Sequence, residues 1–263
     1  MLSVLLGIVL CVALAWKLRQ FLKDPADKLL RAVLLCIVCA ALSFPFGTAG
    51  GARVVDGLAG EGTAKFLQNF ALLLTVYFLQ CFFIYAASHA QSGPDHARKK
   101  LVPLSTTVLV MAAAMPTPRN ERDHTYATAD MQVTGVAVFY LAAGLYLTYA
   151  LAVALRWAVE YARASRRPLA IGLWMVVASL ATMVAAAAVR EAFSVSRWLG
   201  IEVPHPLIMT AKLLLDLAIP LFVLGILYPA AMTRWARLRL WWAPLAGVSA
   251  LGAAVEGNAP GLS

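Results

Sequence analysis

Long apolar runs separated by short polar or charged segments dominate the pattern of this chain. A membrane-spanning helix needs about 20 predominantly apolar residues, because the hydrocarbon core of a bilayer is about 30 Å thick. Seven runs approach this length, at residues 2–22, 29–47, 66–87, 101–115, 133–155, 169–189 and 206–231. The pattern therefore predicts an all-α, polytopic membrane helix bundle of about seven transmembrane helices over residues 1–231.

Three of these runs differ from a simple membrane-spanning helix in length, in proline content or in a possible role as a signal peptide. The run 101–115 would rise only about 22 Å as a helix, so it must borrow flanking residues, thin the bilayer or be shielded by its neighbours. The run 206–231 contains Pro220, which should kink its helix. No Lys or Arg precedes the run 2–22, which favours a retained span over a cleaved signal peptide.

The composition argues against a soluble domain and against a nucleic-acid-binding protein. Hydrophobic residues make up 62% of the 263 residues and charged residues only 13%. A soluble domain is typically about half apolar and a quarter charged, so much of the surface of this chain must face lipid. The formal net charge of +9 does not indicate nucleic acid, because the cations stand in short clusters between the apolar runs.

The Lys and Arg residues alternate between rich and poor loops. On one side we count Lys17, Arg19, Lys23, Lys28, Arg31, Arg98, Lys99, Lys100, Arg156, Arg163, Arg166, Arg167, Arg234, Arg237 and Arg239. On the other side we count Arg53, Lys65, Arg119, Arg122, Arg190 and Arg197. Because cytoplasmic loops carry the excess of Lys and Arg, we expect a multi-pass chain with the N-terminus outside and the C-terminus in the cytoplasm.

The last run holds the best candidate for an intramembrane polar site. Lys212 and Asp216 are four residues apart, which places them on one helix face and within reach of each other. Pro220 follows one turn later and frees a backbone carbonyl near that face. Ionisable groups inside a membrane are costly and are functional candidates by default. The alternative is an internal ion pair that fixes helix packing.

A second candidate is a charge cluster on the outer side. Arg190 and Glu191 end the sixth run, and both could face Lys212 across the helix boundary. The alternative is an ordinary exposed pair, which contributes little stability.

Other polar or small positions within the runs favour packing roles. The amide of Gln80 in the third run is of the kind that joins helices. Gly144 in the fifth run permits close helix contact. Cys36 and Cys39 form a C-x-x-C pattern within an apolar run, where packing is the more common role.

Familiar catalytic signatures are missing from the sequence. No H-x-x-x-H, G-x-S-x-G, P-loop or dinucleotide fingerprint stands in a suitable context. We therefore expect no catalytic residues, no metal site and no cofactor. The alternative is an intramembrane enzyme without a familiar motif.

The chain changes character after the last run. Residues 232–242 mix Arg and Trp, which suits a juxtamembrane segment on anionic lipids of the inner leaflet. Residues 243–263 are small and almost uncharged, and we expect a poorly ordered tail. The expected partners are thus the lipid bilayer and its anionic inner-leaflet lipids, and no nucleic acid.

Several short segments resemble a known family. They are Trp16-Lys17-Leu18-Arg19, Lys23-Asp24-Pro25, Val54-Val55-Asp56, Tyr161-Ala162-Arg163, Arg166-Arg167-Pro168 and the stretch from Trp235 to Trp242. Over residues 1–242 the chain resembles a family of actinobacterial seven-span membrane proteins that are labelled transporters. That family continues into a cytoplasmic tail domain, which the stretch from Ala243 does not resemble. The resemblance implies a location in a bacterial cell membrane and adds the label of a transporter, without a substrate or a mechanism.

Two functions remain open from the sequence. The first is a small transporter or transport-associated protein, based on Lys212, Asp216 and Pro220. The alternative is a seven-helix sensor or partner-binding protein that acts through its basic cytoplasmic loops, such as the one holding Arg163, Arg166 and Arg167.

Overall fold

Helices make up the regular structure of the chain in the computed structural model. The structure describes residues 27–87, 93–115, 131–167 and 169–201, short stretches at 18–19 and 21–22, and parts of 203–232. Within these residues the helices are α2 (Lys28–Phe46), α3 (Ala49–Ala59), α4 (Thr63–Ala87), α5 (Gly93–Lys99), α6 (Leu101–Ala114), α7 (Thr134–Ala164) and α8 (Leu169–Trp198). No strand occurs in this part of the chain, so the all-α prediction is confirmed there.

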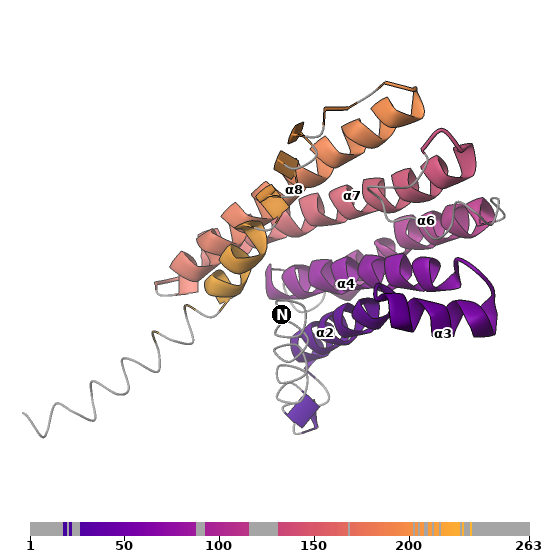
Figure 1. The fold of residues 1–263 in the computed structure, drawn as a ribbon. Coiled ribbons are helices and arrows are strands. Elements are labelled where there is room, and N and C mark those ends of the chain that lie inside the picture. The colour runs from indigo at the N-terminus through magenta and orange to yellow at the C-terminus, as the bar shows by residue number, and fades with distance from the viewer. Residues whose placement is uncertain are drawn as a thin grey trace, which may run out of the picture.

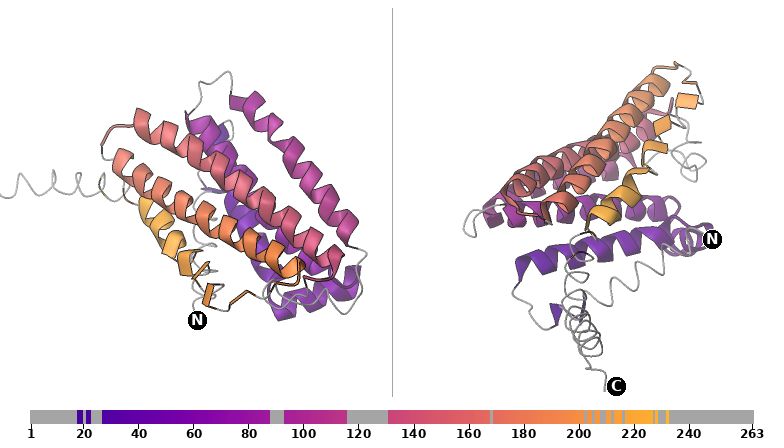
Figure 2. Two further views of the ribbon diagram at one scale, coloured as in Figure 1. Left: turned by 90° about the horizontal axis from the view of Figure 1, so that it is seen from above. Right: turned by 90° about the vertical axis from the view of Figure 1, so that its left-hand side faces the viewer.

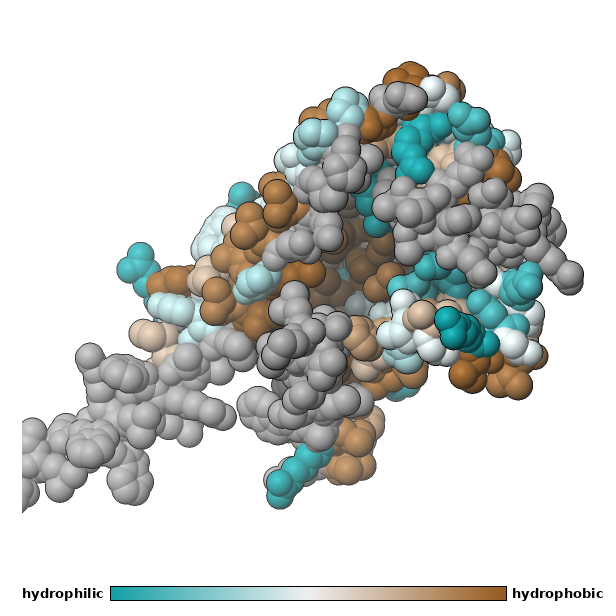
Figure 3. All heavy atoms as spheres, in the orientation of Figure 1, coloured by the Kyte–Doolittle hydropathy of each residue, from teal (hydrophilic) through white to brown (hydrophobic). Residues whose placement is uncertain are grey.

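Four of the helices, α2, α4, α7 and α8, are long and apolar enough to cross a membrane. They match the predicted runs 29–47, 66–87, 133–155 and 169–189. Most of the run 2–22 and parts of the run 206–231 lie outside the described residues, so the count of seven spans stays a prediction. Figure 3 shows apolar side chains over much of one face, as expected of a surface that meets lipid.

The long helices pack in chain order. α2 lies against α4, α4 against α7, and α7 against α6 and α8, as the views in Figures 1 and 2 show. Every fourth residue of the second half of α7 is alanine, and Ala150, Ala154, Ala158 and Ala162 are at most 2% exposed. Small side chains at this spacing let neighbouring helices approach closely.

The alternating direction of the helices brings basic segments together. The beginnings of α2 and α8 and the ends of α4 and α7 lie at one end of the bundle (Figure 1). These ends carry Lys28, Arg31, Arg163, Arg166 and Arg167. The grouping is the one that the predicted orientation requires, and which side of the membrane it faces stays a prediction.

How the short fourth run crosses the membrane stays a prediction. The run forms the 14-residue helix α6, and α5 precedes it with only Lys100 between the two. Residues 93–114 together rise about 33 Å if both pieces run in one direction. The Lys100 Nζ donates a hydrogen bond of 2.9 Å to the Tyr149 hydroxyl of α7, which gives the cation at this junction a polar partner.

The Gly-rich segment 48–65, between the predicted runs 29–47 and 66–87, contains α3. The Thr48 side chain accepts a hydrogen bond from the backbone N–H of Gly51 and so caps the helix. The Asp56 carboxylate accepts a hydrogen bond of 2.7 Å from the backbone N–H of Ala64, tying α3 to the start of α4. Val54 and Leu58 are exposed on α3, a pattern typical of a helix lying on the membrane surface.

We predict that Gly51→Ala destabilises the corner between α2 and α3. A Cβ at this position would overlap the backbone carbonyl of Pro45, which only a backbone shift relieves, at a cost of about 1–3 kcal/mol. The matched control is Gly57→Ala, because a Cβ there meets nothing within 4 Å. That control should stabilise α3 by about 0.5–1 kcal/mol. Thermal unfolding of both variants in detergent measures the difference, and equal stabilities would contradict the described corner.

Candidate functional site

The pair Arg190 and Glu191 lies inside a helix instead of at its end. The sequence placed these residues at the end of a span at 189, whereas α8 continues to Trp198, about two turns further. Arg190 Nε stands 3.8 Å from Glu191 Oε1, with 36% of the Arg190 side chain exposed and 8% of the Glu191 side chain. The two members of the pair therefore have different surroundings, and Glu191 is the buried one.

The Glu191 carboxylate packs directly on the backbone of α7. A Cβ added at Gly144 would overlap the Glu191 carboxylate. The sequence predicted a close helix contact at this glycine, and the structure places the buried acid in it. Gly144 is the central residue of the predicted run 133–155. The acid thus meets α7 at the middle of its apolar stretch.

One oxygen of this carboxylate is left without a hydrogen bond in the described part of the chain. Glu191 Oε2 is buried, and no described residue donates a hydrogen bond to it. Buried polar atoms are nearly always hydrogen-bonded, and a carboxylate inside a membrane is costly and is a functional candidate by default. An acid kept in this position can take up a proton or hold a cation, which would satisfy the free oxygen.

Two further polar groups are buried in the same bundle. Both side-chain atoms of the Gln80 amide on α4, and the Tyr146 hydroxyl on α7, have no hydrogen-bond partner among the described residues. Gln80 is 0% exposed. Its predicted role in joining helices therefore has no hydrogen bond to support it in this part of the chain. A sequence alone could flag each group by its polarity within an apolar run, but not its lack of a partner.

The site predicted in the last run is described only in part. Lys212 and Asp216 lie outside the described residues, so their pairing stays a prediction, as does any approach of Arg190 and Glu191 to Lys212. Pro220 is described, and it is exposed. Its neighbour Ala218 accepts a hydrogen bond of 2.6 Å from the Ser179 hydroxyl of α8.

The same segment also contacts α8 through a glycine. A Cβ at Gly225 would lie 2.7 Å from Val176 Cγ2 and 2.8 Å from the Gly172 carbonyl oxygen. These contacts fix the segment against α8.

Groups of side chains that could bind a metal ion are absent from the described ranges. These ranges contain no group of three or more His, Cys, Asp or Glu residues that could hold a metal ion. Cys36, Cys39 and Cys81 are free thiols in the apolar spans.

The four long apolar helices indicate an integral membrane protein. A scan against protein-family models, a search of curated proteins and a search of solved structures each found no match. The surroundings of Glu191 are therefore the main evidence on function.

Proposed function

We propose that the protein is a small membrane transporter in which Glu191 binds and releases a proton or a small cation. The observation that carries this proposal is the position of the Glu191 carboxylate. It is buried against Gly144 at the centre of a predicted span, and its Oε2 has no partner among the described residues. Intramembrane acids of this kind mark ion pathways and proton relays.

Arg190 gives the site a means of responding to occupancy. Its guanidinium stands at the long limit of an ion pair with the other carboxylate oxygen, and its side chain is partly exposed. When a proton or cation neutralises Glu191, the attraction between the two side chains weakens. Both side chains stand on α8, so the two states of the acid differ in how firmly the Arg190 side chain is held, and a transporter requires two such states.

We predict that Glu191→Gln lowers transport at least tenfold, the consequence of losing about 1.4 kcal/mol or more in a transport step. The amide keeps the size of the side chain and removes its charge. The measurement is proton entry into proteoliposomes that contain a pH-sensitive dye, driven by a potassium diffusion potential, with and without sodium. The matched control is Glu160→Gln, whose carboxylate pairs with Arg156 near the end of α7 with a side chain 43% exposed.

Two results would contradict the proposal. One is a wild-type flux no faster than that of empty vesicles under both ionic conditions. The other is a Glu191→Gln flux equal to that of Glu160→Gln. Asp216→Asn belongs in the same series, because Asp216 is the other candidate carboxylate of the predicted transport site.

A second candidate function is a sensor or partner-binding protein that acts through its basic end. Arg163, Arg166 and Arg167 are all exposed at the junction between α7 and α8. α7 is 31 residues long, about 46 Å, and so exceeds the hydrocarbon thickness of about 30 Å. A partner whose co-purification is lost on replacing these arginines with glutamine, together with a silent Glu191→Gln, would favour this function over transport.

A further inference from the structure

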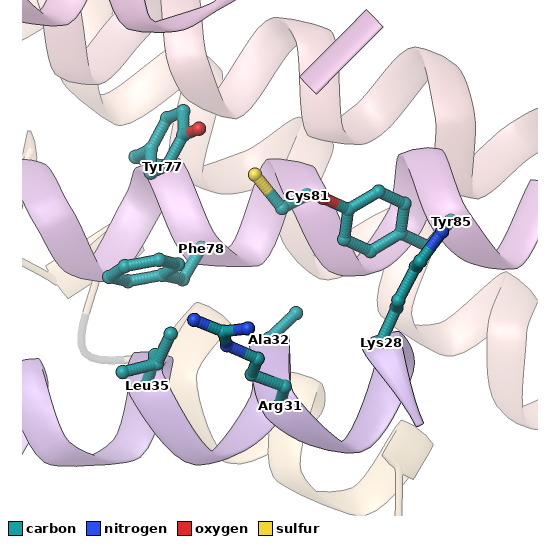
Figure 4. A pocket seen from close by; sticks show the side chains of 8 residues that line it. All are labelled: Lys28, Arg31, Ala32, Leu35, Tyr77, Phe78, Cys81 and Tyr85. Carbon is teal, nitrogen blue, oxygen red and sulfur yellow. The ribbon is translucent and has the colours of Figure 1, made fainter. Parts of the chain in front are cut away.

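A cavity of about 290 Å³ lies between α2 and α4. Its lining comes from the first half of α2 and the second half of α4 (Figure 4). The residues are Lys28, Arg31, Ala32, Leu35, Tyr77, Phe78, Cys81 and Tyr85. The Glu191 site shares none of these residues, so the cavity is a separate feature of the bundle.

Two cations, Lys28 and Arg31, stand at this cavity. Arg31 reaches from α2 toward α4, and the Lys28 side chain extends beside Tyr85 (Figure 4). Neither cation has an ion-pair partner in the described ranges. The neighbouring Asp27 instead uses its carboxylate to accept hydrogen bonds from the backbone N–H groups of Leu29 and Leu30. The cavity therefore favours an anion.

The remaining lining is apolar or aromatic. Phe78 and Cys81 come from α4, and Leu35 from α2, about 10 Å along the helix from Lys28. The Tyr85 hydroxyl supplies a neutral donor, and no hydrogen-bond partner is recorded for it among the described residues. The cavity thus combines two cations with an apolar and aromatic lining, and the Arg31 guanidinium lies on the side of Phe78 and Leu35 (Figure 4).

We propose that this cavity binds the phosphate headgroup of one anionic phospholipid, with the start of an acyl chain against Leu35 and Phe78. Both walls are helices long and apolar enough to span a membrane, so the bilayer supplies anionic amphiphiles at high local concentration. The two cations and the hydroxyl of Tyr85 fit a phosphate, and the apolar lining fits hydrocarbon.

The volume of the cavity agrees with partial engulfment of a lipid. At about 290 Å³ the cavity is close to the lower limit of the 300–1,000 Å³ usual for ligand pockets. This volume is enough for a headgroup and not for whole acyl chains. This site differs from the juxtamembrane Arg and Trp segment at residues 232–242, and it holds whether or not the protein transports ions.

The test is lipid retention by the full chain. The purified protein in detergent is titrated with phosphatidylglycerol or phosphatidylcholine, and bound lipid is counted by native mass spectrometry. The double variant Lys28→Gln, Arg31→Gln should bind phosphatidylglycerol roughly 25-fold more weakly, since each cation near an anionic lipid contributes about fivefold. Phosphatidylcholine binding should change little.

A charge-matched control separates the cavity from the basic surface. The double variant Arg98→Gln, Lys99→Gln removes the same charge from exposed positions on α5. Neither residue lines the cavity, so this variant should change phosphatidylglycerol binding by no more than about twofold, because salt screens charges that lie away from the bound phosphate. Tyr85→Phe leaves the charge unchanged and should weaken binding by about tenfold through the lost hydrogen bond.

Three results would overturn the proposal. Equal losses in the two double variants would show a diffuse electrostatic effect. Undiminished phosphatidylglycerol binding by the Lys28→Gln, Arg31→Gln variant, with its thermal unfolding as in the wild type, would show that the cavity is not the site. Displacement of phosphatidylglycerol by an equal concentration of inorganic phosphate would assign the cavity to a soluble phosphate instead of a lipid.

Discussion

Replacing Gly144 with leucine is expected to force α8 away from α7 and to destabilise the folded bundle by about 3 kcal/mol, at the upper end of the usual cost of overpacking. Even a Cβ at this position would overlap the Glu191 carboxylate, and leucine adds three further carbons. Apparent melting temperature in detergent measures the loss. Gly57→Leu serves as the control, because a Cβ there meets nothing within 4 Å.

A second substitution makes this prediction specific to the contact. If the clash between Gly144→Leu and the Glu191 carboxylate causes the loss, Glu191→Ala should recover stability when combined with it. Residues in direct contact couple by about 0.5–3 kcal/mol in a double-mutant cycle. Additive effects of the two changes would instead place the damage elsewhere in the interface of α7 and α8.

The cores of the four long spans could be predicted from sequence because their signal is local. Length and hydropathy of a run decide whether a helix crosses a bilayer, and no distant residue is needed. The predicted runs 29–47 and 66–87 accordingly agree closely with α2 and α4. The C-terminal end of α8 was not predicted, because the charges of Arg190 and Glu191 ended the apolar run at 189 whereas the helix continues to Trp198. The Glu191 carboxylate is buried against Gly144 of α7. This contact joins residues far apart in the sequence, so a local pattern does not predict it.

Other elements were hidden for different physical reasons. The glycines of 48–65 obscured α3, although Thr48 at its start and the apolar pair Val54 and Leu58 carried a helical signal. The cavity between α2 and α4 is lined by residues of both helices. The spacing of residues within one helix does not show which other helix packs against it. In the sequence, Lys28 and Arg31 are visible only as part of the positive charge of a loop.

Replacing Gln80 with leucine is expected to stabilise the bundle by about 1–3 kcal/mol. Its two polar atoms are fully buried without a partner among the described residues, and their desolvation is not offset by hydrogen bonds. Leucine has a similar volume and suits the apolar surroundings of α4. Thermal unfolding in detergent measures the gain.

Gln68→Leu on the same helix is the matched control for this substitution. Gln68 is partly exposed and accepts a hydrogen bond of 3.4 Å from Lys65 Nζ, so its replacement should change stability by no more than about 0.5 kcal/mol. A loss of stability in Gln80→Leu would mean that the amide has a partner beyond the described residues. A gain in stability accompanied by loss of proton flux has a different meaning. A buried amide kept at a cost in stability, yet needed for flux, joins Glu191 as part of the polar route across the bundle.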